Sequence, residues 1–284
     1  MNMRTLNILS KLYYLNPRWL YLVVSVLLLA PMFLPIPNPE IDAAPAAQGV
    51  YDTVGRCPDD KVILIDSSWD MGSKPECMAL LECFVNDLVK RKKKFVVFSS
   101  NVFAPTFVMG VVEPITDKAG YVYGEDWVNL GFILPPGNNQ ALLVDQLCRD
   151  LHALRPFDIN STPLSELPLM QNVKSAQDIH MVYAVNYCPP EQWISFGKSQ
   201  HGLLVAFGGA AIMAPYYQVY VDSGQLCGLL SGNRGTSEYE SLTGIDGMGK
   251  KVMMSFGFGL CFIIASVILG NIGFNAARHM RRIS

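Results

Sequence analysis

The stretch VILIDSSWDMGSKPE, residues 62–76, decides the fold together with the run FVVF, residues 95–98, that follows it. Four consecutive aliphatic residues open the stretch, as expected of a strand that is covered on both faces. After Pro75 the apolar residues recur at helical spacing, and a proline suits the first turn of a helix. A strand, a helix and a second strand in this order predict two parallel strands with a right-handed connection.

The same alternation continues along the chain. Residues 141–154 and 191–196 are predicted to be helical, and residues 179–185 and 203–207 are predicted to be apolar strands. Four strands alternating with helices indicate an α/β domain with a Rossmann-like layered architecture and a mainly parallel sheet. The basic run at residues 90–94 is expected to end the first helix, where cations complement the helix dipole, and a basic surface patch is the alternative.

Two segments have the length and apolarity to cross a bilayer. Residues 19–36 and 252–274 contain 18 and 23 consecutive residues without a charge, against the ~20 needed to span the hydrocarbon layer. The first segment could instead be a cleaved signal peptide, because Ala44-Pro45-Ala46 matches a cleavage site. We predict one transmembrane helix on each side of the α/β domain.

The predicted division of the chain follows from these segments. It comprises a cytoplasmic N-terminus (1–18), the first span (19–36), a linker (37–50), an extracytoplasmic α/β domain (51–243), a joint (244–251), the second span (252–274) and a cytoplasmic C-terminus (275–284). Arg4, Lys11 and Arg18 precede the first span and three arginines follow the second. By the positive-inside rule both termini are cytoplasmic and the domain lies on the periplasmic or extracellular side of a bacterial inner membrane.

The charge of the chain is unevenly distributed. All 24 acidic residues lie between Glu40 and Asp246, where only 14 of the 22 basic residues occur, so this part carries −10 and the flanking parts +8. Phosphate contacts need basic surfaces, so an acidic domain is a poor nucleic-acid binder. The expected partners are the membrane and other membrane-protein subunits or further copies of the chain, and no nucleic acid.

The seven cysteines suggest neither a zinc ribbon nor a thioredoxin-type motif, because no C-x-x-C is present. Six lie in the central domain, at positions 57, 77, 83, 148, 188 and 227, and Cys261 lies in the second span. An exported domain could pair some of them, but buried free thiols are an equal alternative.

A candidate ligand crevice lies where the apolar runs give way to polar residues, since ligands bind beyond the carboxyl ends of parallel strands. Its residues are Asp66, Ser67, Ser68, Asp70, Ser99, Ser100, Asn101, Asn186, Gly208 and Gly209. The alternative is that Asp66 with Ser67 or Ser68 caps a turn and the following helix.

The residues Asp66-x-Ser68-x-Asp70, followed by Met71-Gly72-Ser73, resemble the metal-ion-dependent adhesion motif of von Willebrand A domains, usually D-x-S-x-S. A helix, FVVFSS and then Thr162 also follow in the order of that family. The resemblance implies a Mg²⁺ site formed by Asp66, Ser68, Asp70 and Thr162, in a metal-dependent binding module or hydrolase. The chain departs from the family in having Asp70 at the third ligand position, Trp69 beside it, and Asn186-Tyr187 where an acidic residue is usual.

No complete catalytic motif is present: the sequence has no G-x-S-x-G, no Walker A loop and no G-x-G-x-x-G after a strand. No catalytic residue is therefore predicted, and no cofactor apart from Mg²⁺ in the alternative interpretation. Residues 121–132 and 223–240 mix glycine, aromatic and acidic residues. They are candidate binding loops or, equally, turns and close helix contacts.

Several short segments resemble a family of uncharacterised bacterial membrane proteins. They are YGEDW (123–127), TPLSELP (162–168), MAP (213–215), and SGQL (223–226) through Tyr239-Glu240. With an apolar segment at each end, the similarity covers nearly the whole chain. It implies a bacterial envelope protein of the predicted architecture, without an assigned activity.

The leading hypothesis is a membrane-anchored envelope protein that acts as a structural or docking subunit of a membrane complex, without catalytic activity of its own. The second span supports helix association through small residues that let helices approach closely. They are Gly257, Gly259, Ser266, Gly270 and Gly273. The alternatives are the metal-dependent module or hydrolase, and a receptor for a small ligand in the crevice.

Overall fold

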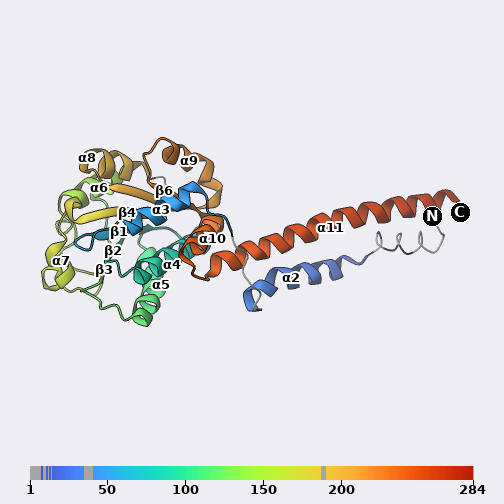
Figure 1. Cartoon of the computed structure of the whole chain (residues 1–284), viewed down its shortest axis with the longest axis horizontal. Coiled ribbons are helices and arrows are strands. Elements are labelled where there is room, and N and C mark those ends of the chain that lie inside the picture. Colours follow the sequence, from blue (N-terminus) through green and yellow to red (C-terminus); the bar gives the residue numbers. More distant parts are fainter. Residues whose placement is uncertain are drawn as a thin grey trace. The chain divides into compact units, whose positions relative to one another are not determined.

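The computed structural model describes residues 8, 11, 13, 15–34, 41–186 and 190–283 (Figure 1). Six parallel strands form one sheet in the order β3-β2-β1-β4-β5-β6. They are β1 (Val62–Ser68), β2 (Phe95–Ser99), β3 (Trp127–Phe132), β4 (Ile179–Asn186), β5 (Leu204–Gly209) and β6 (Gly228–Ser231). The predicted α/β class and the mainly parallel, Rossmann-like sheet are confirmed.

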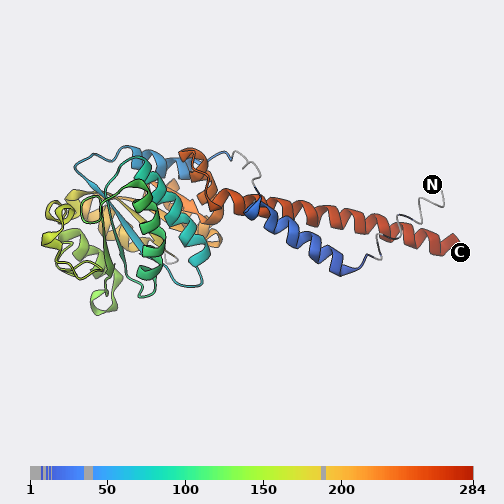
Figure 2. The same ribbon diagram turned by 90° about the horizontal axis from the view of Figure 1, so that it is seen from below.

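Helices cover both faces of the sheet (Figures 1 and 2). One face packs against α3 (Pro45–Gly55), α4 (Lys74–Lys90), α5 (Ala104–Ala119) and α10 (Gly232–Thr243). The other packs against α6 (Gln140–Arg149), α7 (Pro168–Asn172), the π-helix Trp193–Lys198 with α8 (Ser199–His201), and α9 (Ala214–Asp222). All seven residues of β1 are buried, with Leu64 on one face and Ile63 and Ile65 on the other. The two-sided burial explains why β1 is apolar without alternation.

The two edge strands were not predicted as strands. β3 lies in the stretch 121–132 and β6 in the stretch 223–240, both of which were candidate binding loops. β6 has only 4 residues and is followed directly by α10. A Cβ on Gly228 or Gly235 would meet the backbone of α3 or β6, so these glycines permit close packing. The alternative interpretation, turns and close helix contacts, therefore describes the second stretch.

The linker predicted at residues 37–50 is shorter than expected. Helix α3 begins at Pro45, and its residues Ala47, Val50 and Val54 are fully buried in the core. The error arose because a Pro- and Ala-rich sequence resembles a tether, whereas here Pro45 occupies the first turn of a helix.

A loop over residues 155–163 covers the outer edge of β3. The Ile159 N–H donates to the Asn129 carbonyl (2.9 Å), and the Arg155 guanidinium donates to the carbonyl of Phe132 (3.0 Å). These contacts satisfy backbone groups that an edge strand would otherwise expose to pairing with another chain.

Asp158 organises this loop. Its Oδ1 accepts the N–H groups of Asn160 (2.9 Å) and Thr162 (2.7 Å), and its Oδ2 accepts the Tyr123 hydroxyl (2.7 Å). The Asp158 side chain is fully buried, so each lost bond leaves a donor without a partner.

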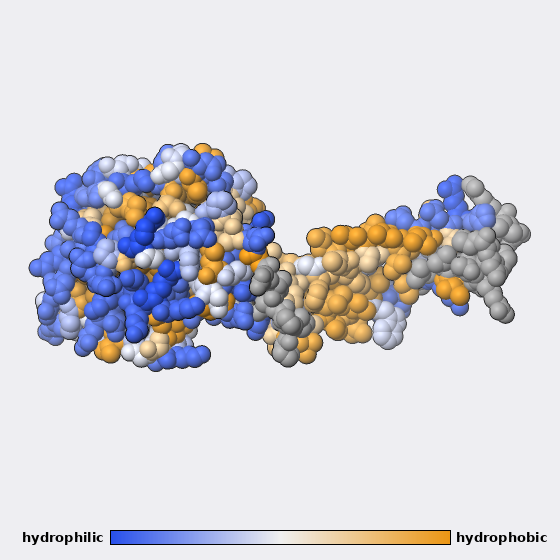
Figure 3. All heavy atoms as spheres, viewed as in Figure 1, coloured by the Kyte–Doolittle hydropathy of each residue, from blue (hydrophilic) through white to orange (hydrophobic). Residues whose placement is uncertain are grey.

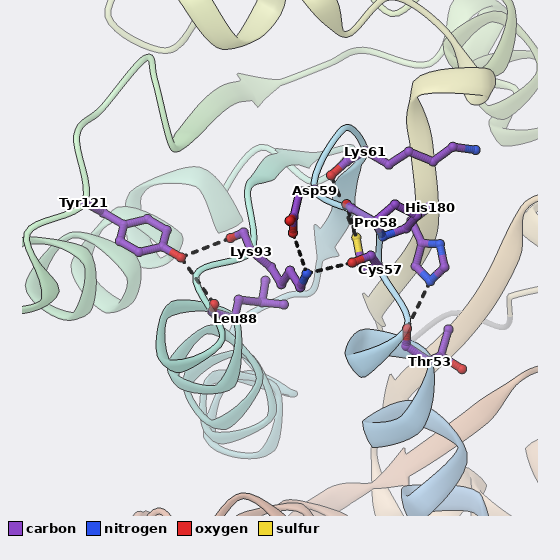
Figure 4. A network of polar contacts seen from close by, with 9 residues as sticks. All are labelled: Thr53, Cys57, Pro58, Asp59, Lys61, Leu88, Lys93, Tyr121 and His180. Carbon is purple, nitrogen blue, oxygen red and sulfur yellow. Dashed lines mark hydrogen bonds and ion pairs between the residues drawn. The ribbon is translucent and has the colours of Figure 1, made fainter.

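A second polar network ties the amino edge of the sheet together (Figure 4). The Lys93 ammonium donates to the Cys57 carbonyl (2.7 Å) and pairs with Asp59 (3.0 Å). The Tyr121 hydroxyl lies 3.2 Å from the carbonyls of both Leu88 and Lys93. The loop before β1 is thereby fixed to the loop before β2.

The basic run at residues 90–94 ends α4, as predicted. Lys90 donates to the carbonyl of Thr243, the last residue of α10. The Arg91 guanidinium pairs with Asp87 (2.8 Å) and stacks 4.0 Å from the centre of the Tyr51 ring. These cations are therefore engaged in holding helix ends together at the amino edge.

The chain also leaves the α/β unit at this amino edge. Two compact units are distinguished, residues 40–250 and residues 1–39 with 251–284. Gly244, with φ of +67°, ends α10, and α11 (Met248–Ile283) begins four residues later. The buried Glu240 carboxylate accepts the N–H groups of Gly249 (2.9 Å) and Lys250 (2.8 Å), so it caps the first turn of α11. The predicted joint at 244–251 is thus helical from Met248 onward.

The other unit contains α2 (Pro17–Phe33) and most of α11. Residues Met248–His279, 32 in number, form a helix long and apolar enough to cross a bilayer. α2 is apolar but has 17 residues, fewer than the ~20 that span the hydrocarbon layer. Apolar residues cover most of the visible surface of both helices (Figure 3). One of the two predicted spans is therefore supported by its length.

The six described cysteines, which exclude position 188, are free thiols. Burial raises the pKa of Cys57 to about 11 and those of Cys77 and Cys148 to about 12. Among the described residues, four of the six free thiols are buried, Cys227 is partly buried and Cys261 is exposed. Cys188 lies outside the described residues.

Replacing Asp158 by alanine tests the role of the loop that covers β3. Because the N–H groups of Asn160 and Thr162 and the Tyr123 hydroxyl all lose their Asp158 acceptor, we expect the free energy of unfolding to fall by about 2–4 kcal/mol. Urea denaturation of the full chain in detergent measures the change. Asp117→Asn, on an exposed α5 position, is the matched control and should change little. Equal stability of Asp158→Ala and the parent chain would contradict this account.

Candidate functional site

The carboxyl edge of the sheet holds the residues predicted as a ligand crevice. The central strands β1 and β4 are adjacent in the sheet, and Ser68 is in register with Asn186. The connections from β1 and β4 run to helices on opposite faces, which makes their junction the topological switch point where ligands bind in open α/β sheets.

Asp66 is buried at this junction and is bonded on both oxygens. Its Oδ1 accepts the Ser68 hydroxyl, and its Oδ2 accepts the Trp193 indole N–H (2.7 Å). Burial raises the pKa of Asp66 to about 6, and these two hydrogen bonds oppose part of that rise. With 6% of its surface exposed, Asp66 links β1 to the helical segment after β4.

The two serines of this strand end are also engaged. Ser67 accepts the indole N–H of Trp69 (2.7 Å). Ser68 accepts the N–H (2.7 Å) and the hydroxyl (3.0 Å) of Ser100, which follows β2. Ser68 therefore joins Asp66 to the neighbouring strand end, so three segments of the edge form one hydrogen-bonded unit.

The turn after β2 is stabilised by its own side chains. The Ser99 hydroxyl donates to the Asn101 carbonyl (2.9 Å) and accepts the Asn101 N–H (3.0 Å). The Asn101 side-chain oxygen accepts the N–H of Phe103 (3.0 Å). Both side chains thus shape the turn that leads into α5, which is the usual role of serine and asparagine in such positions.

Asp70 takes the turn-forming role that the alternative interpretation gives to Asp66 with Ser67 or Ser68. Its Oδ1 accepts the N–H and the hydroxyl of Ser73, both at 2.9 Å, just before α4 begins. These hydrogen bonds lower the pKa of Asp70. Asp66 instead points into the protein, because it is the fifth residue of a strand that is buried along its whole length.

Thr162 is placed away from the other residues of the Mg²⁺ interpretation. It lies in the 155–163 loop that covers β3, where Asp158 binds its N–H. β2 separates β3 from β1, and neighbouring strands are ~4.8 Å apart. Among the described residues no group of three or more His, Cys, Asp or Glu side chains could hold a metal ion. The structure thus brings Asp66 and Ser68 together and places Thr162 at the edge strand.

Gly208 and Gly209 are required by packing at the end of β5. A Cβ on Gly208 would collide with the Tyr183 hydroxyl, and one on Gly209 would collide with the Phe207 ring. The main chain of Asn186 lies 3.3 Å from the position such a Gly209 Cβ would take. Tyr187, named in the comparison with von Willebrand A domains, lies outside the described residues.

Exposed apolar side chains occur at the same edge of the sheet, and sequence reasoning missed them. They occur in the turns after β1, β2 and β5, at the same edge of the sheet. They are Met71 (57% exposed), Val102 (61%), Phe103 (61%) and Ile212 (86%). The only sequence signal for these side chains was a large apolar residue inside a turn. That signal does not distinguish the exposed Met71 from Trp69, which lies two residues earlier and is fully buried.

Comparison with known proteins finds no matching family model, no matching curated protein and no matching solved structure. The interpretation of the site therefore rests on its geometry.

Replacing Asp66 by asparagine tests the state of the buried carboxyl. Because its pKa is raised from 3.8 to about 6 in the folded chain, Asp66 should contribute stability that is fully present below about pH 4 and is lost as the pH rises through 6. The raised pKa corresponds to a contribution of roughly 3 kcal/mol. Urea denaturation at several pH values should show this decrease in the parent and not in Asp66→Asn.

Asp70→Asn is the matched control, because the pKa of Asp70 is shifted in the opposite direction. The Asp70→Asn variant should lack a stabilisation that the parent chain has at neutral pH and loses on acidification. An identical pH profile for Asp66→Asn and the parent chain would contradict the assignment.

Proposed function

We propose that the protein is a membrane-anchored docking subunit of a membrane complex, without catalytic activity of its own. The observation that carries the proposal is the group of exposed apolar side chains at the carboxyl edge, here called the apolar rim: Met71, Val102, Phe103 and Ile212. Other membrane-protein subunits, further copies of this chain among them, are the partners that such a surface would bind.

The anchor is α11, which has the length and apolarity of a bilayer-spanning helix. α2 packs beside α11, because Leu28 of α2 lies 3.0 Å from the position that a Cβ on Gly259 of α11 would take. Before α2, the Tyr13 ring lies 5.6 Å from the ring of Phe274 in α11, measured between ring centres. A Cβ added to Gly257 or Gly270 would meet no atom within 4 Å, so these glycines leave room for another helix to approach closely. The distribution of basic residues favours cytoplasmic termini and a domain outside a bacterial inner membrane.

The apolar rim is suited to protein association. Its four side chains come from turns after three different strands, and β1, β2 and β5 all end at the same edge of the sheet. Exposed apolar side chains gathered at one edge of a fold suit an interaction site, because burying them from water is favourable by about 1.5–3 kcal/mol for each large side chain. Lys74 lies beside this surface with its ammonium 4.1 Å from the centre of the Phe107 ring.

The polar residues beneath the rim give it a fixed shape. Asp66, Ser68 and Ser100 are bonded to one another and to Trp193, and Asp70 and Asn101 stabilise the turns that carry Met71 and Phe103. A preorganised surface loses less conformational entropy on binding, so its contacts contribute more to affinity. This supports a docking role for residues that first suggested a ligand site.

The position of the rim also favours docking. The chain passes from α10 into α11 at the amino edge of the sheet, where Glu240 caps the first turn of α11. The rim lies at the opposite, carboxyl edge of the same α/β unit, and so is separated from the membrane connection by the length of the strands.

The double substitution Phe103→Ser with Ile212→Ser tests the proposal. Losing two of the four rim side chains should weaken association by roughly 2–4 kcal/mol, an affinity loss of about 30-fold or more. The protein is extracted gently from its native membrane, and its mass in detergent is measured by light scattering. We expect the parent chain in a complex larger than one chain of 31.4 kDa, and the variant mainly as a single chain.

Val122→Ser is the matched control, since Val122 is 50% exposed but precedes β3 at the amino edge. The control should retain the mass of the parent complex, and all three proteins should unfold at similar urea concentrations. A parent chain that is extracted alone, or one that needs no detergent for extraction, would contradict the proposed function.

A further inference from the structure

A groove of about 580 Å³ lies at the amino edge of the α/β unit, between the ends of α4 and α5 and residues 245–247. The groove therefore lies at the edge where the chain continues into α11, whereas the apolar rim lies at the opposite, carboxyl edge. Its volume is within the range of sites that bind small molecules, about 300–1,000 Å³. Aliphatic residues, Val89, Ile115 and Ile245 among them, form part of its wall.

The groove contains charges of both signs, and most of them already have partners. The Lys90 ammonium donates to the Thr243 carbonyl, Glu240 caps α11, and Asp246 pairs with Lys250 (3.4 Å). These contacts fix the wall of the groove next to α11.

Glu82 and Lys118 are the two lining charges that remain available. Within the described part of the chain, neither side chain has a hydrogen bond or an ion pair. Glu82 is half-buried on α4, and burial raises its pKa. Lys118 is exposed in the last turn of α5. A groove lined by a half-buried carboxylate and by an ammonium group suits a ligand that carries both a cation and an anion.

The sequence places this groove close to the start of the membrane-spanning segment. Gly247 lines the groove, and the uncharged run begins at Val252, five residues later. At ~1.5 Å per residue, this interval of helix covers about 8 Å. The polar headgroup layer on each side of a bilayer is about 5–8 Å thick. Along the chain, the groove residue Gly247 is therefore separated from the uncharged run by about the thickness of one headgroup layer.

The lining chemistry distinguishes between headgroups. No aromatic side chain is among the described residues that line the groove, whereas quaternary choline groups are bound by aromatic cages. The carboxylates of Glu82, Glu240 and Asp246 disfavour an anionic glycerol headgroup, which offers no cation to them. A primary ammonium can donate hydrogen bonds to a carboxylate, and a phosphate can accept them from Lys118.

We propose that this groove binds the headgroup of an ethanolamine phospholipid, with Glu82 accepting hydrogen bonds from its ammonium and Lys118 donating to its phosphate. The inference rests on the membrane anchoring of the proposed function, and it adds a lipid partner to that function. Glu82 lies in the middle of α4 and Lys118 in the last turn of α5, so the headgroup would bridge two helices.

Native mass spectrometry of the full chain in detergent tests the lipid preference. Equal amounts of phosphatidylethanolamine, phosphatidylcholine and phosphatidylglycerol with the same acyl chains are added, and the bound fraction of each is measured. We expect phosphatidylethanolamine to be retained roughly tenfold more than either of the others. Glu82→Gln and Lys118→Gln should each abolish the preference, and Glu113→Gln, exposed on α5 outside the groove, should keep it.

A competition with soluble O-phosphoethanolamine separates the lipid from its isolated headgroup. Displacement of the lipid by an excess of this compound supports headgroup recognition. Binding of the soluble compound without any retention of phosphatidylethanolamine overturns the lipid assignment. Equal retention of the three lipids, or an unchanged preference in a folded Glu82→Gln and a folded Lys118→Gln, overturns the site. A chain that does not enter lipid vesicles at all contradicts the anchor, and hence the proposed function, independently of these outcomes.

Discussion

The structure depends on one constraint, the burial of a parallel sheet on both faces. Parallel strands need helical crossovers, and these crossovers cover both faces of the sheet. Every residue of β1 is buried, and Ile63, Leu64 and Ile65 have almost no exposed surface. With both faces covered, only the two ends of the strands and the helix surfaces remain for interaction. The functional proposals therefore concern the edges of the sheet.

The two edges have different chemistry. The amino edge is held by cations that bind carbonyl and carboxylate groups, such as Lys90 and Lys93, and by Glu240 at the start of α11. The carboxyl edge carries a buried network around Asp66 and Ser68, surrounded by the apolar rim. Under the proposed function, the domain is joined at one edge to a helix long and apolar enough to cross a bilayer, and the apolar side chains at the other edge bind the partner. A lipid site at the amino edge would add a specific contact with the bilayer to the anchor.

The sequence predicted the central strands and the helix between β1 and β2, because continuous apolar runs and helical spacing are local signals. It missed β3 and β6, which are short edge strands containing Asn129, Gly131 and Gly228. The candidate residues after β1, β2, β4 and β5 lie at the carboxyl edge, where the sequence placed them, but their contacts were not predictable. The bond from Trp193 to Asp66 joins residues 127 positions apart, and no local pattern reveals it. Likewise, the exposure of Met71 beside the buried Trp69 is decided by tertiary packing.

The most direct test of the account is the accessibility of the apolar rim in the native membrane. A cysteine introduced at Ile212, which is 86% exposed, is labelled with a water-soluble maleimide in isolated membranes and again after purification to a single chain. A cysteine at Val122 and the parent chain, whose own described domain cysteines are mostly buried, serve as references. If the rim docks to a partner, position 212 will react slowly in membranes and rapidly in the isolated chain, while position 122 reacts alike in both. Equal reaction of position 212 in the two states would contradict the docking role.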